Sequence, residues 1–247
     1  MRQLFCHVNS IPPLLSSLTG SRLPQGSLCF LSSFSQNSMR TSFYIDGFNL
    51  YFGALARSSS YKWLDLGRLC SRLVPRHKVT RIRYFTAPVT DRPDRPGQRQ
   101  RQLTYLRALD TIPELSVHEG QFRTDRRRRP LAECIQGVGK TVEILETREK
   151  GTDVNLATYL LVDGFSGEYE QAVVVSNDSD LALAIRKVRD VIGLPVGVVN
   201  PAPKKPARLL TESSTFQRYI RATTLAECQF PDELTDDVGT ITKPTEW

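Results

Sequence analysis

The stretch Gln171-Ala-Val-Val-Val-Ser-Asn-Asp-Ser-Asp-Leu181 decides the fold prediction. Its first part, residues 171–175, is nearly all apolar and rich in β-branched valine, as expected for a central parallel strand covered on both faces. Its second part is a polar turn that leads into an apolar pattern with helical spacing over residues 181–188. A buried strand, a turn and a helix in that order favour an α/β protein with a mostly parallel sheet.

The same alternation extends in both directions from this stretch. We predict strands over residues 42–45, 79–85, 115–122, 141–147 and 194–199, and helices over residues 48–57, 66–73, 97–109 and 153–162. Short strands that alternate with helices predict a three-layer α/β sandwich with a mostly parallel central sheet between two helical layers. No run of about 18 apolar residues occurs, which excludes a membrane-spanning helix and a membrane partner on the usual length argument.

The two ends of the chain differ in composition from residues 39–225, which we predict to form one domain. Residues 1–38 hold nine Ser and two Arg but no acid, and we expect an unstructured leader, with Met39 as the natural start of the folded unit. Residues 226–247 are expected to be an acidic flexible tail, because five acids from Phe230 onward face Lys243 alone.

Basic residues collect in one segment of the chain. The full sequence has 33 Lys and Arg against 26 Asp and Glu, a net charge of +7, and residues 76–129 alone hold 14 basic against six acidic side chains. The densest part is Arg126-Arg127-Arg128-Arg129, which we expect in a loop between strands. Such a run favours a polyanionic partner, although a solvated basic loop without a partner is the alternative.

Several chemistries are excluded by residue spacing. The five cysteines form no C-x-x-C pair, so a disulfide scaffold and a zinc finger both lack support. The three histidines are scattered without a spaced Ser or Cys partner, which argues against a nucleophilic triad. With this cysteine usage, we expect a cytoplasmic protein.

Four aspartates and one asparagine are placed at the ends of predicted strands or the starts of helices: Asp46, Asn49, Asp153, Asp178 and Asp180. In an open parallel sheet, ligands bind outside the carboxyl ends of the strands. Each aspartate taken singly is explained as a helix cap. Together, converging carboxylates would repel one another unless a cation lay between them. Oxygen ligands without His or Cys suit Mg²⁺ or Mn²⁺, and Asn49 can supply a neutral oxygen or orient a water.

Three motifs make the sequence recognisable: Ile45-Asp-Gly-Phe-Asn-Leu-Tyr51, Lys150-Gly-Thr-Asp-Val-Asn-Leu-Ala157 and Val175-Ser-Asn-Asp-Ser-Asp-Leu181. In this order they resemble the NYN-domain family of the PIN-like nuclease superfamily, over roughly residues 40–225. The resemblance implies a PIN-like fold and a metal-dependent ribonuclease site at the five residues named above. Family members often have Gly in place of Asn177 and an aromatic residue in place of Leu181, and both departures leave the carboxylates intact.

These observations predict a metal-dependent ribonuclease. One or two Mg²⁺ or Mn²⁺ ions would be held by Asp46, Asp153 and Asp178, with Asp180 as a further ligand or water-orienting base. RNA would be bound by Lys150 and by the arginines at positions 126, 127, 128 and 129. A noncatalytic RNA-binding or regulatory module is the alternative, and dimerisation stays open. A Mg²⁺-dependent phosphatase is less favoured, because a small substrate needs no extended cationic track.

Overall fold

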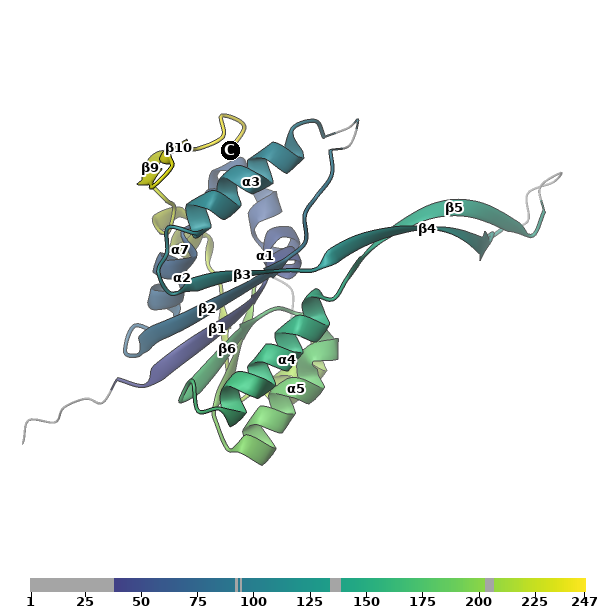
Figure 1. The fold of residues 1–247 in the computed structure, drawn as a ribbon. Helices are drawn as coiled ribbons and strands as arrows, with labels where there is room; N and C mark the ends of the chain where they lie inside the picture. The colour runs from purple at the N-terminus through teal and green to yellow at the C-terminus, as the bar shows by residue number, and fades with distance from the viewer. Residues whose placement is uncertain (1–37, 92, 94, 134–138, 203–206) are drawn as a thin grey trace, which may run out of the picture. The chain divides into compact units, whose positions relative to one another are not determined.

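A computed structural model describes residues 38–91, 93, 95–133, 139–202 and 207–247 (Figure 1). Apart from Ser38, the predicted leader lies outside the described residues. All the described residues belong to one unit, Asn37–Trp247. No helix in the part of the chain that the structure describes is long and apolar enough to cross a membrane.

A six-stranded sheet forms the centre of this unit. Its strands, in spatial order, are β3 (Leu115–Glu119), β2 (Lys78–Thr86), β1 (Arg40–Asp46), β6 (Gln171–Val175), β7 (Val196–Asn200) and β8 (Phe216–Tyr219). Every neighbouring pair is parallel. All five residues of β6 are buried, as its apolar sequence predicted.

Helices cover both faces of the sheet (Figure 1). One face carries α1 (Gly47–Gly53), η1 (Leu55–Arg57), η2 (Ser59–Tyr61), α2 (Leu66–Leu73), α3 (Gln98–Leu109) and α7 (Ala222–Glu227). The other face carries α4 (Thr152–Phe165), η3 (Ser179–Leu181), α5 (Ala182–Lys187), η4 (Val188–Ile192) and α6 (Arg208–Ser213). Neighbouring strand residues alternate between the two cores: Phe43 and Ile45 face the first, and Tyr44 faces the second. The predicted three-layer α/β fold is confirmed.

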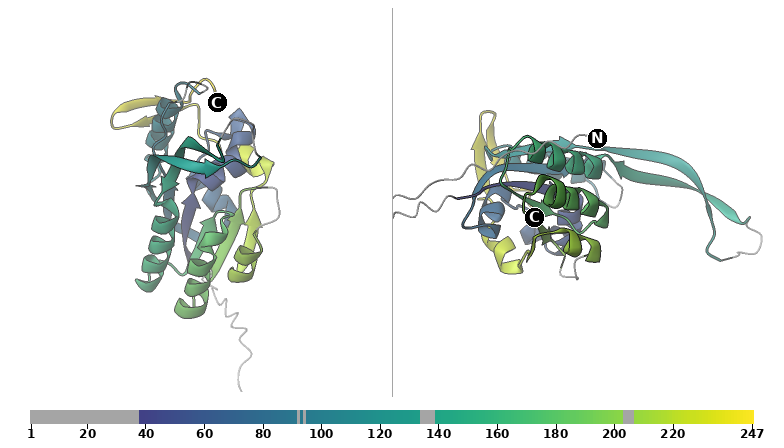
Figure 2. Two further views of the ribbon diagram at one scale, coloured as in Figure 1. Left: turned by 90° about the vertical axis from the view of Figure 1, so that its right-hand side faces the viewer. Right: turned by 90° about the horizontal axis from the view of Figure 1, so that it is seen from below.

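A long β-hairpin, here called the arm, stands outside the main sheet. Its strands β4 (Gln121–Pro130) and β5 (Thr141–Lys150) pair antiparallel along their full length and extend away from the helices (Figures 1 and 2). The prediction of a loop for Arg126–Arg129 was therefore wrong. These arginines adopt strand conformation because β5 supplies hydrogen-bonding partners, with Arg127 opposite Ile144, for example.

The C-terminal segment is folded, contrary to the expected flexible tail. After α7 it forms an antiparallel pair, β9 (Glu233–Asp236) and β10 (Gly239–Thr242). Phe230 and Ile241 are buried in the core on the α2 and α3 face, and the Trp247 ring packs against Trp63. The prediction of a flexible tail rested on the acidic composition and overlooked these apolar side chains, whose burial stabilises the segment.

Candidate active site

Two of the predicted aspartates lie at the carboxyl edge of adjacent strands. Asp46 is the last residue of β1 and caps α1 through its side chain. Asp178 follows β6 by three residues and caps η3 in the same way. Because β1 and β6 are hydrogen-bonded neighbours that run in the same direction, both carboxylates occupy one edge of the sheet.

Hydrogen bonds tie these two carboxylate-bearing turns together. Asp46 Oδ1 accepts from the Asn49 backbone N–H (2.9 Å), and Asp46 Oδ2 accepts from Asn49 Nδ2 (2.7 Å) and Ser176 Oγ (3.1 Å). Ser176 Oγ in turn accepts from the backbone N–H of Asp178 (3.0 Å). Sequence reasoning missed Ser176. The sequence feature that could have identified Ser176 is a hydroxyl side chain directly after an apolar strand.

Asn49 uses both ends of its side-chain amide within the protein. Its Nδ2 donates to Asp46, and its Oδ1 accepts from the backbone N–H of Asn177 (3.3 Å). The Asn177 side chain then accepts from the backbone N–H of Ala207, just before α6 (2.8 Å). Asn49 therefore orients Asp46 and connects the first and third sequence motifs.

The third aspartate, Asp153, is carried by the helix α4. Asp153 lies in the first turn of α4, after Gly151 with φ of +102°, a left-handed conformation that favours glycine. Burial raises the pKa of Asp153 to about 6, and the negative charges of Asp46 and Asp178 add to the rise. Burial also raises the pKa of Asp46, again with a contribution from Asp178. The three carboxylates thus act on one another electrostatically.

Two further acids lie around this group. Asp180 is exposed in η3, donates its backbone N–H to Asp178 Oδ1 (2.9 Å), and adds negative charge near Asp153. Glu149, which sequence reasoning missed, caps α4 by accepting from the Thr152 backbone N–H (3.0 Å) and also raises the pKa of Asp153. The sequence feature that could have identified it is an acid four residues before the helix predicted over residues 153–162.

The residue types fit a hard divalent cation, although their oxygens form no ready-made ligand shell. Among the described residues, no group of three or more His, Cys, Asp or Glu side chains has the geometry to hold a metal ion. Carboxylate oxygens are nevertheless the donors that Mg²⁺ and Mn²⁺ prefer, with several positions left to water. Burial is the main cause of the raised pKa of Asp153, and the nearby negative charges that add to it are ones that a bound cation would neutralise.

The arm begins and ends next to this edge. It leaves the sheet after Gly120, where an added Cβ would lie 2.9 Å from both the Lys150 carbonyl oxygen and Thr152 Cγ2. At its base, the ring of Phe122 packs edge-to-face on Phe48 of α1, with centroids 5.6 Å apart. Lys150 is exposed and ends β5, three residues before Asp153. The base of the arm is therefore fixed beside the aspartates.

The four predicted RNA-binding arginines are spread along the half of the arm away from this base. Arg129 pairs with Glu146 (2.9 Å) and Arg126 with Glu143 (3.7 Å). No ion pair of Arg128 occurs within the described ranges. With Arg123 and Asp125, the run lines a recess of about 540 Å³. The structure does not bring these arginines together with the aspartates.

A second ionic cluster fixes α4 on the sheet. Asp163 is buried near the end of α4 and accepts from Arg83 Nε (2.7 Å), from Arg83 Nη2 (2.9 Å) and from the Tyr44 hydroxyl (2.7 Å). Burial opposes ionisation of Asp163, yet its hydrogen bonds with Arg83 and Tyr44 outweigh burial and hold the pKa of its carboxyl below the usual range. This cluster anchors the helix that carries Asp153.

Comparison with known proteins gives the family. The NYN domain model matches residues 40–220, which contain the aspartates and the arm. The chain belongs to the NYN-domain family. The resemblance is thereby confirmed, and it places the protein in the PIN-like nuclease superfamily, whose nucleases generally use divalent metals.

Two individual proteins are similar to this NYN-domain chain. The 6-hydroxy-3-succinoylpyridine 3-monooxygenase HspA of Pseudomonas putida is 29% identical, with 85% of this chain and 75% of that protein covered. A solved structure of a protein of unknown function from Vibrio parahaemolyticus is 13% identical, covers 75% of this chain and 96% of its own, and has a TM-score of 0.47.

Proposed function

We propose that this NYN-domain protein is a metal-dependent ribonuclease of the cytoplasm that hydrolyses phosphodiester bonds in RNA. The observation that carries the proposal is the placement of Asp46 and Asp178 after the carboxyl ends of two adjacent parallel strands, with Asp153 in the first turn of α4. Mg²⁺ or Mn²⁺ would be held by these three side chains, with Asp180 as a further ligand or water-orienting base. A bound divalent ion supplies an activated water and stabilises charge on the phosphate.

The chain's own residues prepare the site for this chemistry. Asn49 and Ser176 hold the Asp46 carboxylate in one orientation through three hydrogen bonds. Ser176 also holds the turn that presents Asp178. A carboxylate fixed in this way loses little conformational freedom when it binds, so the geometry for attack on the phosphate is largely set in advance.

The arm supplies the proposed RNA-binding surface. Its arginines and Lys150 would contact the phosphate backbone, and their positive charge would offset the repulsion between RNA and the aspartates. RNA that lies along the arm reaches its base, where Lys150 precedes Asp153 by three residues. The proposed basic surface extends from the recess on the arm to the carboxylates. This extent favours a long polyanionic substrate over a small phosphoester.

The competing functions would use the arm and the carboxylates differently. A noncatalytic NYN module would use the arm to bind RNA but would cleave little. A small-molecule phosphatase would need the carboxylates but not the arm. The name of the Pseudomonas relative describes a monooxygenase that acts on 6-hydroxy-3-succinoylpyridine. This compound therefore serves as a further test substrate.

The experiment incubates the full chain with labelled single-stranded RNA and Mn²⁺, with and without EDTA. We compare the wild type with Asp178→Asn and with Asp110→Asn, a matched control at the exposed end of α3. Cleavage that is lost with EDTA and in Asp178→Asn, but kept in Asp110→Asn, supports the ribonuclease. Binding without metal-dependent cleavage would instead indicate the module. Turnover confined to a small phosphoester or to the pyridine substrate would refute the proposal.

A further inference from the structure

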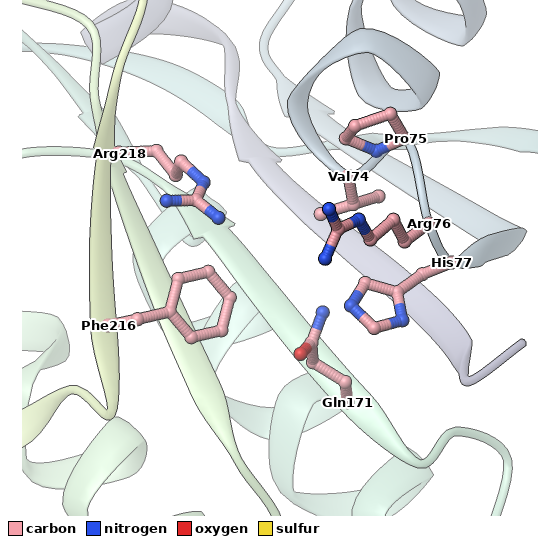
Figure 3. Close-up of a pocket in the computed structure, with 7 residues that line it drawn as sticks. All are labelled: Val74, Pro75, Arg76, His77, Gln171, Phe216 and Arg218. Carbon is pink, nitrogen blue, oxygen red and sulfur yellow. The ribbon is translucent and has the colours of Figure 1, made fainter.

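A second pocket lies at the opposite edge of the sheet from the aspartates. It has a volume of about 310 Å³, within the range of small-ligand sites (Figure 3). Gln171 lines it and is the first residue of β6, whose other end leads to Ser176 and Asp178. The pocket and the aspartates are therefore separated by the full length of a strand, and neither site shares a residue with the other.

The pocket gathers positive charge without a counter-charge. Arg76, from the turn after α2, and Arg218, on β8, extend toward each other across it (Figure 3). No acidic residue lines the pocket, and neither arginine forms an ion pair with any residue that the structure describes. Two facing guanidinium groups repel each other, and an anion between them would relieve that repulsion. Guanidinium groups also match phosphate oxygens with two parallel hydrogen bonds.

Two polar side chains lie beside the cationic pair. His77 and Gln171 both line the pocket, and the Gln171 amide lies beside the His77 ring (Figure 3). Gln171 is buried and donates from Nε2 to Thr41 Oγ1 (3.3 Å). These two side chains make this part of the pocket polar.

An aromatic ring completes the pocket, and a glycine on the neighbouring strand leaves room for it. Phe216 on β8 pairs in register with Gly197 on β7, and a Cβ added to Gly197 would run into the Phe216 ring. Glycine therefore lets the ring lie flat on the neighbouring strand. The Arg218 guanidinium lies 5.6 Å from the centre of this ring. An aromatic face beside arginines is the arrangement on which nucleobases stack in sequence-tolerant sites.

We propose that this pocket binds a nucleotide, with its phosphate between Arg76 and Arg218 and its base against Phe216. The pocket acts separately from the aspartates, so this inference does not depend on the ribonuclease proposal. The same chemistry can come from a free mononucleotide or from the 5′-phosphorylated end of an RNA strand, and the experiment distinguishes these two sources.

The test is isothermal titration of the full chain with AMP in the presence of EDTA, which prevents binding through a metal at the aspartates. We expect AMP to bind at least tenfold more tightly than adenosine, which lacks the phosphate, and than nicotinate, whose ring carries a carboxylate instead. Arg76→Gln and Arg218→Gln should each weaken AMP binding about tenfold or more. A 5′-phosphorylated tetranucleotide that binds more tightly than AMP identifies RNA ends as the source, and the reverse order identifies free nucleotides.

Two control variants separate the proposal from folding and from the aspartates, and a third variant tests the role of the Phe216 ring. Arg186→Gln makes the same charge change at an exposed position of α5 and should leave AMP affinity unchanged. Asp178→Asn should also leave it unchanged, even if RNA cleavage is never observed. Gly197→Ala, which displaces the Phe216 ring, should lower AMP affinity toward that of inorganic phosphate. The proposal is overturned if AMP does not bind, if nicotinate binds equally well, or if the Arg76 and Arg218 variants, shown to be folded by circular dichroism, bind AMP like the wild type.

Discussion

Replacing Asp163 by Asn tests whether one buried ion pair fixes α4, and with it Asp153, on the sheet. The Asp163 side chain is 6% exposed and the Arg83 side chain 13%, and two hydrogen bonds join them. Asn keeps the size of the side chain but removes its charge, which leaves the Arg83 guanidinium without a counter-charge. Breaking a buried pair costs about 3–5 kcal/mol, and we expect about 3 kcal/mol here because Asn retains one acceptor oxygen.

The assay is urea unfolding followed by tryptophan fluorescence, which reports on buried Trp63 and on Trp247, whose ring packs against it. With a urea dependence of about 2 kcal/mol per molar, the midpoint should fall by about 1–2 M. In an Arg83→Met background, Asp163→Asn should cost less, since the Arg83 guanidinium is already absent and only the longer ion pair with Arg81 (3.6 Å) remains. The matched control Asp190→Asn removes an exposed pair with Arg189 and should leave the midpoint close to that of the wild type.

The reasoning is refuted if Asp163→Asn shifts the midpoint no more than Asp190→Asn does. It is also refuted if the cost of Asp163→Asn is the same with and without Arg83, because the pair would then contribute no coupling. A consequence for function follows from the position of Asp153 at the other end of α4. If the proposed ribonuclease activity is found, Asp163→Asn should reduce it even at temperatures where the protein stays folded.

Three further predictions concern pH, RNA affinity and the site. Asp163 has a pKa below its ordinary value of 3.8, so its contribution to stability is present above about pH 4 and is lost as the pH falls further. The difference in urea midpoint between the wild type and Asp163→Asn should therefore shrink between pH 5 and pH 3. Arg126→Ala combined with Arg127→Ala should weaken RNA binding and reduce the slope of log affinity against log salt by about 1.4, measured by fluorescence anisotropy; an unchanged slope removes these arginines from the binding surface. Ser176→Ala should lower metal-dependent cleavage about tenfold at unchanged RNA affinity, because Asp46 loses one of its three hydrogen bonds; equal cleavage rates would contradict its positioning role.

Much of the fold could be predicted from local patterns. The strand Gln171–Val175 and the helix Leu66–Leu73 have the predicted bounds, and the Asp65 side chain caps that helix by accepting from the Arg68 backbone N–H. In these segments the hydrophobic period and the capping residue agree with the final environment. The sequence also placed Asp46 and Asp178 after predicted strands, and the structure shows these strands to be parallel neighbours, while the catalytic roles of the two residues stay predictions.

Other features required contacts between distant parts of the chain. Four consecutive arginines have little apolar pattern, and only the pairing of residues 121–130 with residues 141–150 makes them a strand. The hydrogen bond between Ser176 and Asp46 joins residues 130 positions apart, and the ion pair between Arg83 and Asp163 joins residues 80 apart. Neither sequence spacing nor composition specifies such partners.

The sequence by itself determined most strands and helices of the central α/β fold and at which strand ends the acids occur, because these properties depend on neighbouring residues and on hydrophobic period. Tertiary structure alone decided that the arginines stand on an extended arm, that the C-terminal segment joins the core, and that Arg76, Arg218 and Phe216 share a pocket. Strand register and packing bring these groups together, and both are set by nonlocal burial and hydrogen bonding that no short window of sequence contains.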